Sequence, residues 1–203
     1  MDKIRRLLIP GIALASAGGI VLWRHWPARD APPAGPPSVT VLDDRLTVPE
    51  FRAEGTQGAL TRASLLGRWT MLFFGYTHCP DVCPTTLATM AEVVRGLDAA
   101  TRPQVLFVSV DPERDTAELL AAYVPKFDPA FIGARGRDED LAPLLAHLGV
   151  MVARQPRDAN GQYGVDHTAS MFLIDPKARL KAAFGWPHDP ARVRADYLRL
   201  TRR

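Results

Sequence analysis

Cysteine is scarce in this sequence, with two residues among 203. So low a number excludes the disulfide framework that stabilises many small secreted domains. Internal repeats are also missing, which argues against solenoid and propeller architectures. Hydrophobic residues make up 47% of the chain and charged residues 23%. This composition is typical of one globular domain with a real core and some additional segments.

Outside its N-terminus the chain has almost no excess charge. Residues 1–29 hold five basic residues and one acidic residue, while the rest of the chain holds 20 basic and 21 acidic residues. A nearly neutral domain has no electrostatic footprint for a polyanion, so we do not expect nucleic acid as a partner. Positive charge beside an apolar N-terminal stretch instead indicates membrane topology.

The uncharged apolar run at residues 7–23 reads LLIPGIALASAGGIVLW. Its roughly 17 residues are near the minimum for a helix that crosses a bilayer. Basic residues precede the run, and Trp23 and Trp26 follow where an interfacial aromatic belt would lie, which favours a cytoplasmic N-terminus. Residues 15–17 resemble a signal-peptidase site, so a cleaved signal peptide is the alternative. We favour a retained membrane anchor over residues 1–27.

Residues 28–38, ARDAPPAGPPS, contain four prolines and a glycine and offer little to bury. This composition predicts a semi-extended linker between the anchor and a folded domain. The domain itself is predicted to span residues 39–203, outside the cytoplasm.

Strand and helix signals alternate along this domain. Continuous apolar runs predict buried strands, and apolar residues at helical spacing predict amphipathic helices. A parallel βαβ unit followed by an antiparallel hairpin predicts an α/β, thioredoxin-like fold, with a mixed central sheet flanked by helices and a late β-hairpin insertion. The predicted strands are 46–51, 70–76, 104–110, 170–174 and 180–184, and the predicted helices are 85–99, 116–124, 138–148 and 190–200.

The two cysteines, Cys79 and Cys83, lie in the stretch FFGYTHCPDVCPTT at residues 73–86. This stretch joins a predicted central strand to its helix, a place where ligands and reactive groups gather in such sheets. A proline follows each cysteine and disfavours helical geometry before it, so we expect a compact loop that enters the first helical turn. Backbone N–H groups and the helix dipole there favour thiolate over thiol.

Three chemical roles are open to this cysteine pair. A purely structural disulfide would close a very short loop and remove little entropy from the unfolded chain, so it is the weakest of the three. Redox exchange and metal binding both require a thiolate. The spacing, one residue longer than in a thioredoxin-type pair, does not separate them.

Two thiolates seldom complete a metal site, so the five histidines are the next candidates. His167 lies in the sequence GVDHT, in the loop that enters the predicted hairpin. In a thioredoxin-like sheet this loop faces the cysteine loop. Thioredoxins place a cis-proline there, whereas this chain has no proline between Pro156 and Pro176. We interpret His167 as a metal ligand, with backbone capping as the alternative. The other histidines fit a ligand less well: His78 should point away from its neighbour Cys79, His147 lies in a leucine-rich helix, His188 lies in an exposed turn, and His25 flanks the anchor.

Three sequence blocks together give a more specific pattern: GYTHCPDVCP at 75–84, SVDPERDT at 109–116 and DHTASMFLIDP at 166–176. In this order they resemble the signature blocks of the Sco/SenC family, which are membrane-anchored, thioredoxin-fold copper proteins that serve cytochrome c oxidase assembly. The resemblance runs from about residue 46 to the C-terminus. Residues 51–66 match the family pattern only loosely, which leaves the first strands poorly defined.

The resemblance implies that Cys79, Cys83 and His167 bind copper. Two soft thiolates suit Cu(I) and an added imidazole suits Cu(II), although zinc also accepts such donors. It further implies a metallochaperone, rather than a turnover enzyme, that delivers copper to the dinuclear copper centre of the oxidase. The expected partners are the copper-site subunit of cytochrome c oxidase and a periplasmic copper donor or thioredoxin-like reductant. The expected location is the bacterial periplasm or the mitochondrial intermembrane space.

The competing function is a thiol–disulfide oxidoreductase that reduces the cysteines of the oxidase copper site. It needs a redox disulfide between Cys79 and Cys83 and tolerates the loss of His167.

Three aspartates could support such a site without binding the metal. Asp81 would add negative charge near the copper, while Asp111 and Asp115 could act on His167 or on partner docking. Each also has a purely structural interpretation. Asp81 would interact with a helix N-terminus, Asp111 would form a turn with the proline after it, and Asp115 would cap the helix at 116–124.

Overall fold

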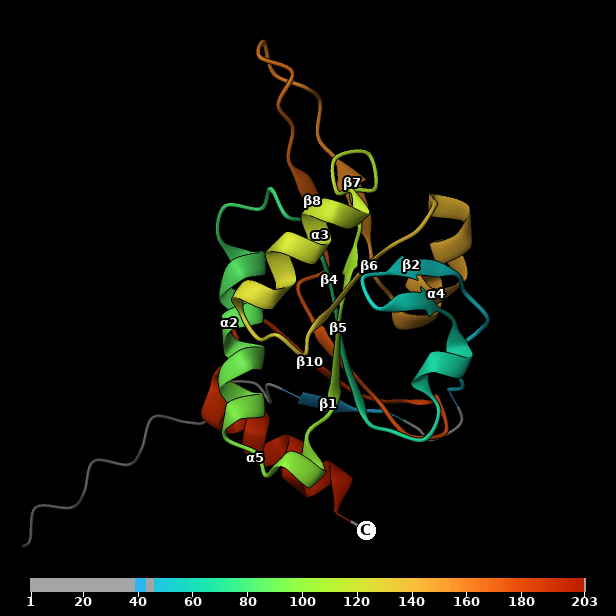
Figure 1. Ribbon diagram of the computed structural model, residues 1–203, viewed down its shortest axis with the longest axis vertical. Coiled ribbons are helices and arrows are strands. Elements are labelled where there is room, and N and C mark those ends of the chain that lie inside the picture. The colour runs from blue at the N-terminus through green and yellow to red at the C-terminus, as the bar shows by residue number, and fades with distance from the viewer. Residues whose placement is uncertain (1–38, 43–45, 203) are drawn as a thin grey trace, which may run out of the picture. The chain divides into compact units, whose positions relative to one another are not determined.

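The computed structural model describes residues 39–42 and 46–202 (Figure 1). An eight-stranded mixed sheet forms its centre, in the order β1-β10-β9-β4-β5-β6-β2-β3, and β7 and β8 pair separately. The strands are Val39–Val41 (β1), Ala53–Gly55 (β2), Gly58–Leu60 (β3), Thr70–Gly75 (β4), Gln104–Ser109 (β5), Ile132–Arg135 (β6), Val152–Arg154 (β7), Val165–His167 (β8), Met171–Ile174 (β9) and Leu180–Phe184 (β10). The helices are Val82–Arg95 (α2), Ala117–Tyr123 (α3), Asp138–Leu148 (α4) and Pro190–Thr201 (α5), with 3-10 turns at Arg62–Leu65, Ala99–Thr101 and Val124–Lys126.

The centre of the sheet is parallel and largely apolar. β4 pairs with β5, and β5 pairs with β6, in the same direction. Every residue of β4 is buried, as the continuous apolar run predicts for a strand covered on both faces. Figure 1 shows α2 and α3 on one side of these strands and α4 on the other. The two crossovers therefore place the carboxyl ends of β4 and β5 at one edge, where the cysteine loop begins.

The late hairpin completes the sheet in the antiparallel direction. β9 pairs with both β10 and β4, and Met171 lies opposite Phe73. Because β9 runs against β4, its start lies beside the end of β4. The segment before β9 is thereby brought to the cysteine loop, as the thioredoxin-like prediction requires. The predicted α/β, thioredoxin-like fold is confirmed.

The predicted strand at 46–51 is wrong. Thr47 makes one isolated bridge to Arg179, with hydrogen bonds from Val48 N–H to the Ala178 carbonyl and from Leu180 N–H to the Leu46 carbonyl, and the segment forms no strand. Pro49 interrupts the segment and has no N–H for a ladder. Val48 and Phe51 are still buried, so the apolar pattern marks core contacts and not a strand.

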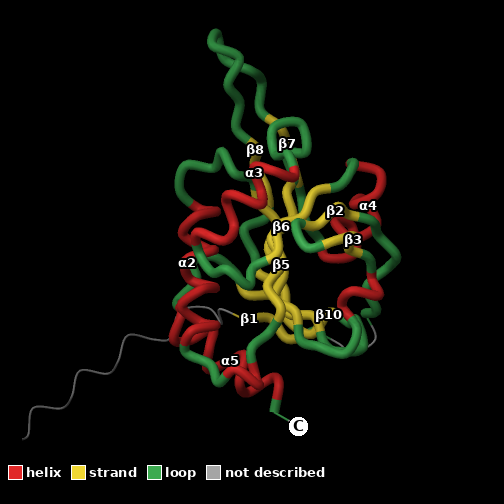
Figure 2. The backbone as a smooth tube through the Cα atoms, viewed as in Figure 1, coloured by secondary structure: helices red, strands yellow, loops and turns green. Residues whose placement is uncertain are grey.

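Several short strands were absent from the prediction. β2 and β3 form a hairpin on β6 at the far edge of the sheet, and β1 adds to β10 at the near edge. β7 and β8 form a separate hairpin whose long connecting loop extends away from the sheet (Figure 2). Their three or four residues are too few for a periodic signal, so tertiary pairing decides them.

The expected anchor at 1–27 and linker at 28–38 lie outside the described residues. Within residues 39–42 and 46–202, no helix is long and apolar enough to cross a membrane.

Candidate metal centre

The cysteine loop leaves the buried strand β4 and enters the first turn of α2. Cys79 is half-buried in the loop, whereas Cys83 is buried completely, and both are free thiols. The backbone N–H of Cys83 donates to Sγ of Cys79 over 3.4 Å. The predicted loop running into a helical turn is confirmed. Pro84 fits there because the first four N–H groups of a helix have no partner within it.

Gly75, the last residue of β4, makes room for the buried thiol. A Cβ at this position would lie 2.9 Å from Sγ of Cys83 and 2.7 Å from Cε2 of Phe107. Both contacts are shorter than packed atoms allow, so the strand can carry only glycine at this point without moving the sulfur.

His167 meets the cysteines from the other side of the site. Its Nε2 lies 3.4 Å from Sγ of Cys83, although 84 positions separate the two residues. Its Nδ1 lies 3.1 Å from the carbonyl oxygen of Thr168, which can only accept, so Nδ1 carries the proton. Nε2 is thereby left facing the sulfur of Cys83. His167 is the last residue of β8 and not, as predicted, part of a loop.

The ring of His167 is held by aromatic neighbours. Phe73 and Tyr76 each meet it edge-on, with ring centroids 6.0 Å away. Edge-to-face contacts of this kind restrict ring orientation. The imidazole is thus fixed by rings on β4 and just after it, the same segment that leads to the cysteines.

The spacing of these donors fits a shared metal ion. With metal–sulfur and metal–nitrogen bonds of about 2.3 and 2.0 Å and a tetrahedral angle, two ligands lie about 3.5 Å apart. The 3.4 Å between Sγ of Cys83 and Nε2 of His167 agrees with that separation. Nevertheless, over the part of the chain that the structure describes, no three His, Cys, Asp or Glu side chains together form a ready cluster for a metal ion. Cys79 lies beside this pair, since its sulfur accepts from the backbone N–H of Cys83.

The two thiols differ in acidity. Hydrogen bonds with the Cys83 thiol, with His167 and with the backbone N–H groups of Cys83 and Asp81 outweigh burial and lower the pKa of Cys79 to about 3. The hydrogen bond between the two cysteines, together with burial, raises the pKa of Cys83 well above its ordinary value. Near neutral pH the metal-free site therefore holds one half-buried thiolate and one fully buried thiol.

Asp115 ties the start of the cysteine loop to the end of β5. Its side chain is fully buried and accepts hydrogen bonds from the backbone N–H and the hydroxyl of Thr77 and from the hydroxyl of Ser109. The expected capping by Asp115 is wrong, because Thr116 is the N-cap and accepts from the N–H of Leu119. Asp115 instead acts on the segment that carries the cysteines.

Asp111 acts on the other side of the site. Its carboxylate is fully buried and accepts from Nε of Arg114 at 2.5 Å and from the hydroxyl of Tyr163 at 2.7 Å. Tyr163 leads into β8 and therefore into His167. The expected local turn also forms, since the carbonyl of Asp111 accepts from Arg114 N and Asp115 N. Asp81, in contrast, is exposed, and its side chain accepts only from the hydroxyl of Thr85, at 3.3 Å, among the described contacts.

Residues 40–202 match the protein family described as SCO1/SenC. The chain belongs to this family. It is 41% identical over 128 residues to the human "Protein SCO1 homolog, mitochondrial", a match that covers 62% of this chain and 42% of the relative. A Stutzerimonas stutzeri "Putative copper-binding protein" is 38% identical over 147 residues, 71% of this chain and 72% of that protein. The chain thus spans less than half of the human relative.

Solved structures of SCO1/SenC proteins have the same fold. Bradyrhizobium japonicum ScoI with copper bound is similar at a TM-score of 0.68 and 36% identity, over 76% of this chain and 99% of that one. Apo Sco1 from Thermus thermophilus gives a TM-score of 0.72 and 35% identity, over 80% of this chain and 96% of that one.

The remaining histidines of this SCO1/SenC chain lie away from the thiols or outside the described residues. His78 is exposed, and its Nδ1 lies 3.1 Å from the Thr77 hydroxyl and 3.7 Å from the Asp115 carboxylate. His147 lies on α4, beside the carbonyl of Leu46. His188 was expected to be exposed but is half-buried, with its ring against Trp186, and burial lowers its pKa. His25 is not described.

Sequence reasoning missed Arg114, Tyr163 and Gly75. All three lie in or beside the blocks that carry the family resemblance. The sequence did offer one indication for Arg114, namely a charged residue within a turn that was interpreted as structural. Such a residue could have been expected to have a partner. Its partners, however, include the carbonyl of Tyr163, 49 positions away, and a sequence alone does not locate them.

The low pKa of Cys79 leads to a testable reactivity. Iodoacetamide reacts with thiolate, and a thiol of ordinary pKa near 8.5 should lose about a thousandfold in rate between pH 8 and pH 5. Since Cys79 stays ionised down to about pH 3, its alkylation rate in the metal-free full chain should change by less than about threefold over this range. Cys83 should react far more slowly at every pH. Mass spectrometry of timed samples measures both rates.

The Cys79→Ser variant is the control and should show no fast phase. A rate for Cys79 that falls tenfold per pH unit below pH 8 would contradict the asymmetric pair.

Proposed function

We propose that this chain is a copper metallochaperone that binds copper through Cys79, Cys83 and His167. The observation that carries the proposal is the 3.4 Å contact between Sγ of Cys83 and Nε2 of His167, beside the Cys79 thiolate. Membership of the SCO1/SenC family and the copper named for its relatives support the same metal. Soft thiolates favour Cu(I), and the imidazole extends the set to Cu(II).

The two cysteines suit a cargo that must leave again. Copper enters and exits on the side of Cys79, which solvent and a partner can reach, whereas Cys83 and His167 hold it from within. A thiolate of the recipient takes the open coordination position, after which the bonds to this chain break one by one. When its bond to copper breaks, Cys83 regains a proton readily because its pKa is raised, and this favours release.

The proposed recipient is the copper-site subunit of cytochrome c oxidase. The family's role in oxidase assembly supports an oxidase partner, and the mitochondrial relatives support a location outside the cytoplasm. In this proposal residues 1–27 anchor the chain in the membrane and residues 28–38 link the anchor to the domain. The domain then lies in the periplasm or the intermembrane space, where a copper donor loads it.

A replacement of His167 tests the three-ligand site. In the full chain, His167→Ala should weaken Cu(II) binding by about a hundredfold or more, because one of three strong donors is lost. Cu(I) binding should change by less than about tenfold, since both thiolates remain. Absorption and EPR follow Cu(II), and competition with a chelator follows Cu(I). His78→Ala is the matched control, with no expected change. Unchanged Cu(II) affinity in His167→Ala would remove the three-ligand site.

One observation favours thiol–disulfide exchange as a second function: a half-buried thiolate beside a fully buried thiol. Cys79 would attack a disulfide of the oxidase subunit, Cys83 would resolve the mixed disulfide, and two electrons would pass to the target as the pair becomes a disulfide. A thioredoxin-like reductant would then restore the pair. This activity should survive His167→Ala and vanish in Cys79→Ser, whereas the copper function should respond to both.

A further inference from the structure

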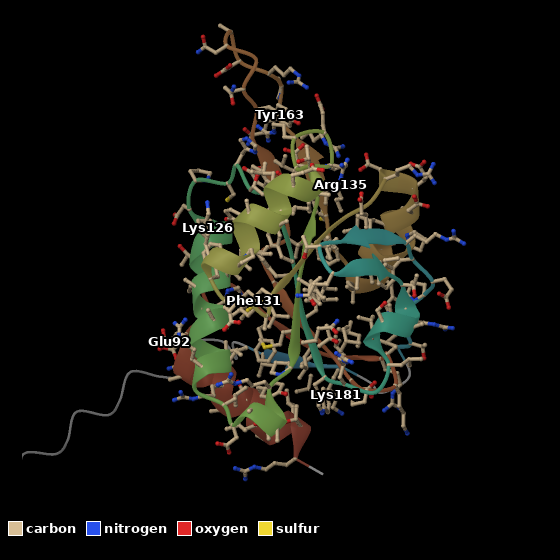
Figure 3. All side chains as sticks on the ribbon, in the orientation of Figure 1. Glu92, Lys126, Phe131, Arg135, Tyr163 and Lys181 are labelled. Atoms are coloured by element: carbon tan, nitrogen blue, oxygen red, sulfur yellow. The ribbon has the colours of Figure 1, made fainter. Side chains whose placement is uncertain are left out.

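Arg114 occupies the turn between β5 and α3 and is held by contacts on several sides, while its Nη2 is buried without a hydrogen-bond partner. Its Nε donates to the buried Asp111 carboxylate at 2.5 Å, and its Nη1 donates to the carbonyl of Tyr163 at 2.9 Å. Its Cζ lies 3.6 Å from the centre of the Tyr163 ring, a close cation–π contact. The side chain is only 17% exposed. Figure 3 shows Tyr163 near the base of the long β7–β8 loop.

The same guanidinium faces the cysteine loop. Its Cζ lies 5.6 Å from the centre of the Tyr76 ring, which in turn meets the His167 ring edge-on. The hydroxyl of Tyr76 accepts from the backbone N–H of Val165, two residues before His167. Arg114 therefore touches residues from both segments that must converge on the metal: Tyr76 leads to the cysteines, and Tyr163 leads to the histidine.

The hairpin that carries His167 needs such a support. β7 and β8 pair only with each other among the described strands, and they are outside the main sheet. Arg157 reinforces the support, since it pairs with Glu113 and lies 4.6 Å from the Tyr163 ring centre. Cationic and aromatic side chains thus alternate in a row, which begins with Arg157 in the long loop and continues through Tyr163 and Arg114 to Tyr76.

We propose that Arg114 is a positioning residue that sets the distance between His167 and the cysteines, and thereby sets Cu(II) affinity without touching the metal. This inference rests on the proposed copper site. Arg114 acts through Tyr163 and Asp111 on β8 and through Tyr76 on the His167 ring. The planar fork is essential, because Nε and Nη1 donate to two separate acceptors while the guanidinium plane lies against a ring. The compact ammonium of lysine has no such plane and does not span the two acceptors in the same way.

The effect should be selective for Cu(II). Both thiolates belong to the cysteine loop, whose anchor Asp115 does not contact Arg114 among the described hydrogen bonds. Loss of Arg114 removes its hydrogen bonds to Asp111 and Tyr163 beside the hairpin, whereas the cysteine loop keeps its hydrogen bonds to Asp115. The imidazole should therefore move more than the two sulfur atoms. A general loss of stability would weaken both oxidation states alike, so the difference between them separates positioning from a structural role.

The test compares four variants of the full chain: Arg114→Gln, Arg114→Lys, His167→Ala and Arg199→Gln. Removal of a group that orients a metal ligand typically costs about 10- to 100-fold in affinity, and we expect that loss for Cu(II) in both Arg114 variants. Cu(I) affinity should stay within about threefold, and the Cu(II) EPR spectrum should move towards that of His167→Ala. Arg199 is the matched control. It also pairs with an aspartate three positions away, but on α5, and its variant should match the wild type.

The metal-free protein gives an independent readout. The amide of Val165 should exchange its hydrogen faster in both Arg114 variants, while amides of β4 and β5 should not. If Arg114→Gln fails to fold, the test rests on Arg114→Lys, which keeps a positive charge beside Asp111. Wild-type Cu(II) affinity and spectrum in a folded Arg114 variant would overturn the proposal. If His167→Ala also binds Cu(II) normally, the proposed copper site itself is wrong, and this outcome is distinct from a failure of Arg114 alone.

Discussion

Cys83→Ser should abolish tight copper binding while leaving the metal-free fold intact. Metal sites with four protein ligands bind with roughly 10–16 kcal/mol, so one lost thiolate costs about 3 kcal/mol, or about a hundredfold to a thousandfold in affinity. A serine hydroxyl is hard and does not ionise at neutral pH, so it does not replace the sulfur for Cu(I). Chelator competition measures the loss, and circular dichroism checks the fold.

A second substitution of Cys83 separates its role in copper binding from its effect on the pKa of Cys79. Cys83→Ser keeps a donor beside Cys79, so Cys79 should keep a low pKa and rapid alkylation at pH 5. Cys83→Ala removes the donor that is the main cause of that low pKa, so alkylation at pH 5 should slow sharply. Both variants should lose copper. Wild-type copper affinity in both would show that Cys83 is not a ligand.

The central elements and the cysteine loop could be predicted because their signals are local. Six consecutive apolar residues mark β4, and helical spacing of apolar residues marks α2 directly after it. The position of His167 followed from topology, since a late strand antiparallel to β4 begins where β4 ends. The prediction that His167 lies near the cysteines therefore needed only the order of the elements and not their exact bounds.

The supports of the site could not be predicted in the same way. Thr77 and Asp115 are 38 positions apart, and Asp111 and Tyr163 are 52 positions apart. An aspartate before a helix or a proline has an adequate local interpretation, as a cap or a turn, and sequence reasoning favoured it. In the folded protein, hydrogen-bond donors that are distant in sequence compete with the local backbone groups for these carboxylates. At Asp115 they replace the local role entirely, and at Asp111 they add to it.

The short strands of the sheet could not be predicted for a different reason. β1, β2, β3 and β6 have three or four residues each, and their pairing depends on neighbours that only the finished sheet supplies. At 46–51 the error is the reverse, because a strand was predicted that does not form. The buried apolar residues give the pattern of a strand, but Pro49 lacks the N–H that strand pairing needs. Burial and pairing are separate properties, and a short apolar pattern reports only the first.

Asp115→Ala should give the largest loss of stability among changes near the site. It leaves the half-buried N–H and hydroxyl of Thr77 and the fully buried hydroxyl of Ser109 without their acceptor. Unpaired buried donors cost about 1–3 kcal/mol each, with partial relaxation, so we expect a fall of about 3 kcal/mol in the free energy of unfolding. For a domain of this size that corresponds to a fall of about 6–12 °C in Tm. Urea and thermal unfolding of the metal-free chain measure it.

The two other aspartate changes make this result specific. Asp115→Asn keeps one acceptor oxygen and should lose about half as much, because the Ser109 hydroxyl can reverse its role and accept from the amide. Asp81→Asn is the matched control on the same loop. Its side chain is exposed, so stability should change by no more than about 0.5 kcal/mol. Copper affinity should follow the same order, since Asp115 holds the segment that positions Cys79. Equal stability of Asp115→Ala and Asp81→Asn would show that the buried carboxylate does not anchor the cysteine loop.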